Sequence, residues 1–458
     1  MNLTLDRLSA LAAIRSIRCG MAPGAQRDIA SLRRTGIAAP ELPEGRRRWS
    51  ASCIDLSNLG LVRGARENRP VEVAVSSERD RIRSKAFSSI IHTASLPKDA
   101  YLDAGNGLRV ASPELVFVEM GTVMRPEVQA LLGYELTGSF SRSPSDPRGG
   151  AIAYGIPPAT SVEKIERFLS QCEGNAGVAQ SRRVIGYVAN NAWSPAEAVI
   201  AALMALPLEY LGYGMGRLVL NDRQTAADEL TRSGTRTSRV PDILVPGTCV
   251  GINYDSFYHL DLDSVIEAAR ACALAPNDKT AAAILESTRR AVREKFLDDL
   301  RRNRELAAQG LVVLPATSED LYRKGGFDAL MVEVFRTIEL LSGKDMTESR
   351  RALASPAVCE RRQTLIWSLL GWEQGRCYAR KQAERDQRGI QRLKDPQIVE
   401  VEMVLSGPRR ALLAGGGGWP GPWRLGALLF LLNYCAIFRN SFLSTGHMSF
   451  SKELSFNN

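Results

Sequence analysis

Cysteine spacing typical of metal sites is absent from this sequence. The 458-residue chain has eight cysteines, but they are scattered, no C-x-x-C pair occurs, and no histidine lies close to any of them. The spacing of zinc ligands is therefore absent, and no disulfide framework is expected in a chain of this size. We expect reduced, mainly structural cysteines and a cytoplasmic location.

Long apolar runs are also scarce. A mean hydropathy of −0.14 excludes a protein with many membrane spans. The segment Met1–Gly20 lacks an apolar core followed by a small-residue cleavage site, so it predicts a short amphipathic helix rather than a signal peptide. The apolar run Trp423–Phe438 is shorter than the about 20 residues of a spanning helix. It predicts a buried or interfacial helix, with a tail anchor as the alternative; we expect no stable membrane association, but this run leaves the question open.

Apolar and charged residues occur in the proportions of a globular protein. Hydrophobic residues make up 45% and charged residues 24% of the chain, which is enough for a buried core and two or three domains. Lys and Arg number 59 against 50 Asp and Glu, giving a formal net charge of +9. Such an excess suits a polyanionic partner without proving one.

The first part of the chain predicts a helix, a linker and an α+β domain. Residues 21–48 contain Pro, Gly and a basic cluster, so residues 1–49 are interpreted as an N-terminal helix and linker. Residues 50–180 form the α+β domain. Its expected elements are strands at Val71–Val75 and Leu108–Val110, a helix opened by Ser112 and Pro113, and an amphipathic helix over Ser161–Cys172.

Residues 182–343 predict a second domain, of α/β type, with a small mixed sheet flanked by helices. Residues 344–458 are interpreted as a charged and apolar tail that is not attached to the core chemistry. The expected elements of the α/β domain are a helix from Ser194, a strand over Leu218–Leu220, a hairpin over 240–258, helical residues 262–309 and a buried strand over Leu311–Leu314.

The hairpin carries the residues most suited to chemistry. Pro246 and Gly247 form its turn, and side chains alternate between the two faces of each strand. If the strands pair across this turn, Asp242 lies near Asn253 and Asp255 on one face. Carboxylate and amide oxygens are the ligands that Mg²⁺ prefers, and a bound Mg²⁺ can promote attack on a phosphodiester.

Each of these residues also has a purely structural interpretation. Asp in such contexts often caps a turn through its own backbone. Glu197 completes a capping box with Ser194, although it can also project toward the sheet edge and join a metal shell. His259, four residues after Asp255, can shuttle a proton or hold a phosphate, or have no chemical role.

An arginine-rich helix follows the hairpin. Val292, Phe296 and Leu300 form an apolar row at helical spacing, and the basic residues fall off that row, on exposed faces. Basic side chains on such a helix can track phosphates without reading bases, or can simply be solvated. The candidate nucleic-acid-binding residues are Arg301, Arg302 and Arg304.

Together these motifs resemble a known family. Their order is S-P-x-E at Ser194–Glu197, P-D at Pro241–Asp242, Tyr-Asp-Ser with a trailing His at Tyr254–His259, and D-x-x-R-R-N at Asp298–Asn303. This order is similar to the very-short-patch-repair-like (Vsr-like) endonuclease domain of the PD-(D/E)XK superfamily. In a group of actinobacterial proteins this domain follows a region similar to AbiEi-type antitoxins, which Ser112–Phe117 and Leu132–Gly138 resemble. The resemblance covers roughly residues 50–340.

The resemblance implies a restriction-endonuclease-like mixed sheet flanked by helices, and it implies roles for single residues. Asp242 is implied as the first metal-binding aspartate, Glu197 as the helix-borne carboxylate, and His259 as the trailing histidine. Asp255 stands where the superfamily motif has Lys. Asn253 replaces the second acidic ligand and removes a negative charge, and residues 260–295 are longer than the usual gap.

Three functions therefore remain open. The first is a Mg²⁺-dependent DNA endonuclease, with catalytic Asp242, Asp255 and His259 and a metal shell of Asp242, Asn253 and Glu197. The second is a non-catalytic, antitoxin-like DNA-binding regulator that retains the nuclease fold, which the loss of charge at Asn253 favours. The third is an interaction protein with no nucleic-acid role.

Overall fold

The computed structural model describes residues 2–21, 28–50, 53, 56, 70–232, 235–255, 262–275, 278–371, 375, 377, 380 and 384, which belong to one compact unit, residues 1–384. The predictions for His259 and for the apolar run at 423–438 lie outside these residues. Within the described residues no helix is both long and apolar enough to cross a membrane. The seven described cysteines carry free thiols.

A six-stranded sheet forms the N-terminal part, in the order β2-β5-β6-β1-β3-β4. Strand β1 pairs in parallel with β6 and antiparallel with β3, and the other pairs are antiparallel except β3 with β4. The strands are β1 (Leu3–Leu5), β2 (Arg34–Thr35), β3 (Val71–Val75), β4 (Phe87–Ile91), β5 (Tyr101–Gly105) and β6 (Leu108–Ala111).

The start of the chain differs from the prediction. Helix α1 (Arg7–Arg18) forms, but the residues before it form strand β1, where Leu3 and Leu5 are fully buried. The prediction of one helix from Met1 is therefore wrong for these residues, because pairing with distant strands decides their conformation. The expected linker is also wrong in part, because β2 pairs with β5.

Helices pack around this sheet and lead to the second sheet. Ser112 caps α2 as predicted, its Oγ accepting a hydrogen bond from the Leu115 N–H at 3.2 Å, and the amphipathic helix expected over Ser161–Cys172 is α4. The elements here are α2 (Pro113–Met120), α3 (Pro126–Thr137), β7 (Phe140–Ser141), β8 (Ala153–Tyr154), α4 (Val162–Ser170), α5 (Val178–Ile185) and α6 (Pro195–Ala205). Short 3-10 turns lie at Ile29–Ser31, Glu78–Asp80, Leu208–Tyr210 and Arg351–Leu353.

The second sheet has four strands in the order β14-β13-β12-β9. The pairs β9–β12 and β12–β13 are antiparallel, whereas β13 and β14 are parallel and joined through helices α8 and α9. This is a mixed sheet with helices against it, as the sequence predicts. Its strands are β9 (Val219–Leu220), β12 (Ile243–Leu244), β13 (Val250–Asp255) and β14 (Val312–Thr317). A separate two-stranded ribbon consists of β10 (Gln224–Thr225) and β11 (Ser238–Arg239), which α7 (Asp228–Arg232) connects.

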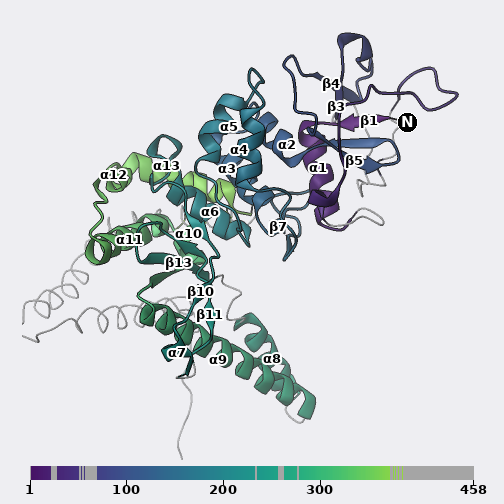
Figure 1. The fold of residues 1–458 in the computed structure, drawn as a ribbon. Helices are drawn as coiled ribbons and strands as arrows, with labels where there is room; N and C mark the ends of the chain where they lie inside the picture. Colours follow the sequence, from purple (N-terminus) through teal and green to yellow (C-terminus); the bar gives the residue numbers. More distant parts are fainter. Residues whose placement is uncertain are drawn as a thin grey trace, which may run out of the picture. The chain divides into compact units, whose positions relative to one another are not determined.

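Helices α9 and α11 flank the second sheet, and Figure 1 shows β13 between them. The predicted helical stretch 262–309 consists of two helices, and Gly310 ends the second with a positive φ of 82°, as expected of a helix C-terminus. The helices are α8 (Leu262–Leu274), α9 (Lys279–Ala308), α10 (Ser318–Tyr322), α11 (Gly326–Ser342), α12 (Thr347–Arg350) and α13 (Pro356–Leu369).

The segment interpreted as a tail contributes to the core. Met346, Leu365 and Ile366 are buried in the same hydrophobic cluster as the sheet residues. Arg362 of α13 is fully buried, donates hydrogen bonds to the carbonyl oxygens of Leu211 and Ala352, and pairs with Asp328. Helix α13 therefore belongs to the folded unit.

Candidate functional site

The predicted hairpin forms and places its polar residues side by side. Ile243 pairs with Ile252, and Gly247 occupies the turn with a positive φ of 72°. The Asp242 N–H donates to Asn253 Oδ1 at 3.0 Å, and the Tyr254 N–H donates to Asp242 Oδ2 at 2.6 Å. The Asp242 carboxylate is thus fixed between strands β12 and β13.

Asn253 acts in this structure as a link between the two strands. Its side chain is 1% exposed, and its Oδ1 already accepts the Asp242 N–H. Its Nδ2 has no hydrogen-bond partner among the described residues. The contact with Asp242 accounts for an amide at this position, and the ligand role of Asn253 stays a prediction.

Glu197 connects to the hairpin through Asn221. Its backbone N–H donates to Ser194 Oγ at 3.2 Å, as expected of a helix cap. Its Oε2 accepts the Trp193 N–H at 3.0 Å and Asn221 Nδ2 at 2.9 Å. The Asn221 N–H in turn donates to the Asp242 carbonyl oxygen at 2.9 Å, so the Glu197 carboxylate is linked to the hairpin. Ser194 caps α6, but the reciprocal bond of the predicted capping box is replaced by the bond from the Trp193 N–H.

Asp255 is held by an arginine from α9. Arg302 Nη2 lies 3.4 Å from Asp255 Oδ1 and 3.6 Å from Asp299 Oδ1. The Arg302 side chain is only 18% exposed, so it does not lie on an exposed face as the sequence predicts. Arg301 and Arg304 are exposed, as predicted. Arg302 therefore belongs with the acids rather than with the solvent-facing arginines.

The acids Glu197, Asp242 and Asp255, here called the acid cluster, repel one another. Burial and then the negative charge of Glu197 raise the pKa of Asp242 to about 7, and Asp255 adds to the rise. The Tyr254 N–H and Arg302 oppose it. Burial also raises the pKa of Glu197. A bound cation would favour the ionised form of each acid.

The carboxylates of the acid cluster are near one another but are not closed around a single point. Within the described part of the chain, these three acids do not bring one oxygen each to within 4.8 Å of the others. Asp242 Oδ2 and Glu197 Oε2 accept backbone or amide N–H groups instead. The cluster has the donor atoms of a Mg²⁺ site, and the ion would have to draw them together.

A basic cavity of about 590 Å³ lies beside α9. Four arginines and two acids line it, and the acids pair with Arg236 and with the buried Arg239. Arg301 and Arg304 make no ion pair with a described residue, so they supply unneutralised positive charge. The lining residues of this arginine cavity are Thr235, Arg236, Arg239, Asp298, Arg301, Arg304 and Glu305.

The acid cluster and the arginine cavity are attached to the same stretch of α9. Arg302 contacts β13 through Asp255, whereas Glu305 and Asp298 contact β11 through Arg239.

No protein-family model, curated protein or solved structure matches the chain. The function of these two features is therefore argued from their own chemistry.

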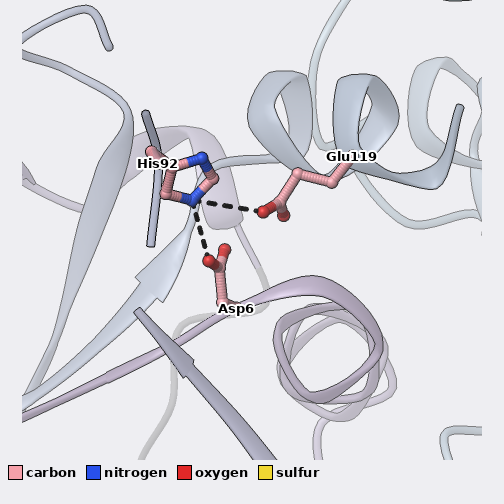
Figure 2. A group of neighbouring side chains, drawn as sticks. All are labelled: Asp6, His92 and Glu119. Atoms are coloured by element: carbon pink, nitrogen blue, oxygen red, sulfur yellow. Dashed lines mark hydrogen bonds and ion pairs between the residues drawn. The ribbon is translucent and has the colours of Figure 1, made fainter. Parts of the chain in front are cut away.

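A further group of polar residues was not predicted from the sequence. Asp6, His92 and Glu119, here called the N-terminal triad, converge within the N-terminal part (Figure 2). Asp6 and His92 are 86 residues apart, and no spacing motif joins them to Glu119. The one signal available in the sequence is that His92 is among only three histidines in the chain.

Proposed function

We propose that this protein binds DNA and hydrolyses phosphodiester bonds with Mg²⁺ held at the acid cluster. The observation that carries the proposal is the hairpin geometry, which holds Asp242 against Asn253 and links it to Glu197 through Asn221. The negative charge of Glu197 also contributes, after burial, to the raised pKa of Asp242. Acids held this close in a half-buried site favour a cation. The restriction-endonuclease-like architecture implied by the family resemblance is consistent with the mixed sheet and with Glu197 on the preceding helix.

The residues fit a Mg²⁺ ion by the chemistry of their donors. Asp242, Asp255 and Glu197 would hold it through carboxylate oxygens, the ligand type that Mg²⁺ prefers. Bound Mg²⁺ supplies an activated water and stabilises the charge that builds on the phosphodiester. Arg302, next to Asp255, places a fixed positive charge where a phosphate oxygen would approach. His259 keeps its proposed role as proton shuttle.

The arginine cavity supports DNA as the polyanion. Arg301 and Arg304 belong to the stretch of α9 that also carries Arg302, and neither forms an ion pair with a described acid. Arginines of this kind bind phosphates and fix the position of a duplex without reading its sequence. The formal net charge of +9 acts in the same direction.

Nicking of supercoiled plasmid tests the proposed function. The wild-type protein is expected to convert supercoiled to relaxed plasmid with Mg²⁺ present and not with a chelator, and Asp242→Ala is expected not to cleave. Cleavage that persists in Asp242→Ala would assign the activity to another source. Absence of both cleavage and DNA binding would favour an interaction protein with no nucleic-acid role.

A non-catalytic DNA-binding regulator is the second candidate. Two observations favour it: Asn253 supplies no negative charge, and Arg302 already pairs with Asp255. If the wild-type protein binds DNA tightly, in a salt-sensitive way, but does not cleave it with Mg²⁺, this function applies. Activity gained on Asn253→Glu would then identify a site that has lost one ligand.

Neutralising the cavity arginines is expected to weaken DNA binding in steps. Arg301→Gln and Arg304→Gln should each lower affinity for a 20-base-pair duplex by roughly tenfold at about 0.1 M salt, and reduce the salt slope by about one, because each removes one phosphate contact. Fluorescence anisotropy over a salt series measures both quantities.

The matched control is Arg79→Gln, which removes an exposed arginine from the N-terminal part. It should leave the salt slope unchanged. Equal losses in all three variants would mean that net charge alone, and not the arginine cavity, attracts DNA.

A further inference from the structure

The N-terminal triad brings three metal-ligating side chains to one point. His92 Nε2 lies 2.9 Å from Asp6 Oδ2 and 3.4 Å from Glu119 Oε1. Figure 2 shows this ring nitrogen facing both carboxylates. Asp6 is 0% and Glu119 5% exposed, whereas His92 is 16% exposed, so the group is buried with its imidazole nearest to solvent.

Three separate elements place these side chains. Asp6 follows β1 and precedes the first residue of α1, but its side chain makes no capping hydrogen bond. His92 comes directly after β4, and Glu119 lies in the last turn of α2. The group therefore joins chain segments that are distant in sequence, and local backbone capping does not explain it.

The triad and its surroundings also contain polar atoms without hydrogen-bond partners. Asp6 Oδ1 has none among the described residues, and neither has the hydroxyl of Tyr101, whose side chain is 2% exposed. The negative charges of Asp6 and Glu119 raise the pKa of Tyr101, after burial, so its hydroxyl lies within their field. Buried polar atoms are normally paired with protein, water or an ion.

The triad contains two acids but only one basic side chain. The Arg7 backbone N–H donates to Glu119 Oε2 at 3.2 Å, and the positive charge of Arg7 also acts on this carboxylate, although the two side chains form no ion pair. Two buried carboxylates thus face one imidazole, which carries at most a single positive charge.

We propose that Asp6, His92 and Glu119 bind one divalent transition-metal ion of the Mn²⁺, Fe²⁺ or Zn²⁺ class. One imidazole nitrogen and two carboxylate oxygens suit these ions. Ligands bonded at about 2.1 Å to one ion lie roughly 3.0–3.4 Å apart. The distances from His92 Nε2 to the two carboxylate oxygens, 2.9 and 3.4 Å, are close to this range. The ion neutralises both carboxylates and fastens β1, β4 and α2 together. This site is independent of the acid cluster and of the proposed cleavage.

In the alternative explanation the triad binds no metal. A charged His92 then forms an ion pair with the two acids. The two explanations predict opposite effects of Glu119→Gln. If the group is a metal site, this variant relieves repulsion in the metal-free protein, so its melting temperature rises. The variant also abolishes metal binding. If it is an ion pair, the variant removes a partner of the charged ring and lowers the melting temperature, and added metal has no effect.

Mn²⁺ is the probe, because it prefers oxygen and nitrogen ligands and is poorly bound by the thiols of this chain. The full chain carrying Asp242→Asn is titrated so that the acid cluster does not contribute, and free Mn²⁺ is followed by electron paramagnetic resonance. One equivalent is expected to bind and to raise the melting temperature by about 5 °C at saturation. Adding Glu119→Gln, or His92→Gln, should remove both effects.

Glu114→Gln is the matched control, since Glu114 is also buried on α2 but pairs with Arg34. It should lower the melting temperature and leave Mn²⁺ binding intact. Circular dichroism establishes whether each variant is folded. If Glu119→Gln does not fold, His92→Gln takes its place in the test. No Mn²⁺ bound by the parent chain, or equal binding with and without Glu119→Gln, would overturn the proposal.

Discussion

Asp242→Asn is expected to lower the rate of plasmid cleavage at least about a thousandfold and, at the same time, to stabilise the metal-free protein. The first effect follows because the amide offers no charge to Mg²⁺, whose contribution to the reaction is several kcal/mol. The second follows because the ionised carboxylate is partly buried and lies within the field of Glu197. Asparagine keeps the shape of the side chain and its contact with the Tyr254 N–H.

The stabilisation should depend on pH in a defined direction. Folding raises the pKa of Asp242 from 3.8 to about 7, so the folded state holds this proton more tightly than the unfolded state. The contribution of Asp242 to stability therefore falls as the pH rises from about 4 to about 7, by at most about 4 kcal/mol. At pH 8 we expect Asp242→Asn to be about 1–3 kcal/mol more stable than wild type, with a smaller difference at pH 5.

Denaturant unfolding with a chelator at pH 5 and pH 8 measures this difference. Asp228→Asn, which changes an exposed acid on α7, is the control and should alter neither cleavage nor the pH dependence. An Asp242→Asn protein that is less stable than wild type at pH 8 would mean that the carboxylate serves the fold, and would contradict its assignment to a cation site.

Arg362→Ala is expected to destabilise the protein by about 3–5 kcal/mol. The guanidinium is fully buried, pairs with Asp328, donates to two backbone carbonyl oxygens and lies 4.2 Å from the centre of the Tyr213 ring. Its removal leaves two carbonyls without their donor and leaves the partly buried Asp328 carboxylate with the Tyr213 hydroxyl as its remaining side-chain donor, which accounts for a loss of this size. Arg361→Ala, at the exposed neighbouring position, should change stability by no more than about 0.5 kcal/mol.

Thermal and denaturant unfolding of the full chain compare the two arginine variants. The difference between them reports whether α13 folds with the rest of the unit. Equal stability of Arg362→Ala and wild type would show that α13 detaches without cost.

Features with a local chemical signature could be predicted from the sequence. Ser112 and Ser194 cap their helices because a hydroxyl before a proline satisfies the first free N–H groups of a helix. The turn at Pro246–Gly247 set the hairpin register, and alternation along β13 then placed Asn253 and Asp255 on the face of Asp242. The elements of the acid cluster were predictable for this reason.

Features that depend on distant contacts could not be predicted. Arg302 sits on a helix face that looks solvated in the sequence, and only the approach of β13 makes it a partner of Asp255. Arg362 belongs to a stretch whose charge suggested a tail, because a buried arginine is recognised only by the carbonyls and acid that surround it. The N-terminal triad is drawn from three elements whose contact no sequence spacing encodes.

Strand β1 lies inside its sheet, so its pairing depends on strands that are synthesised after it. Strand β1 pairs with β3 and β6, so it can pair with β3 only once the chain has grown past residue 75, and with β6 only once it has grown past residue 111. During that interval the buried Leu3 and Leu5 are exposed, and a chaperone or the surface of the ribosome is free to hold them. A fusion partner joined at the N-terminus would have to leave this strand room to enter between its neighbours.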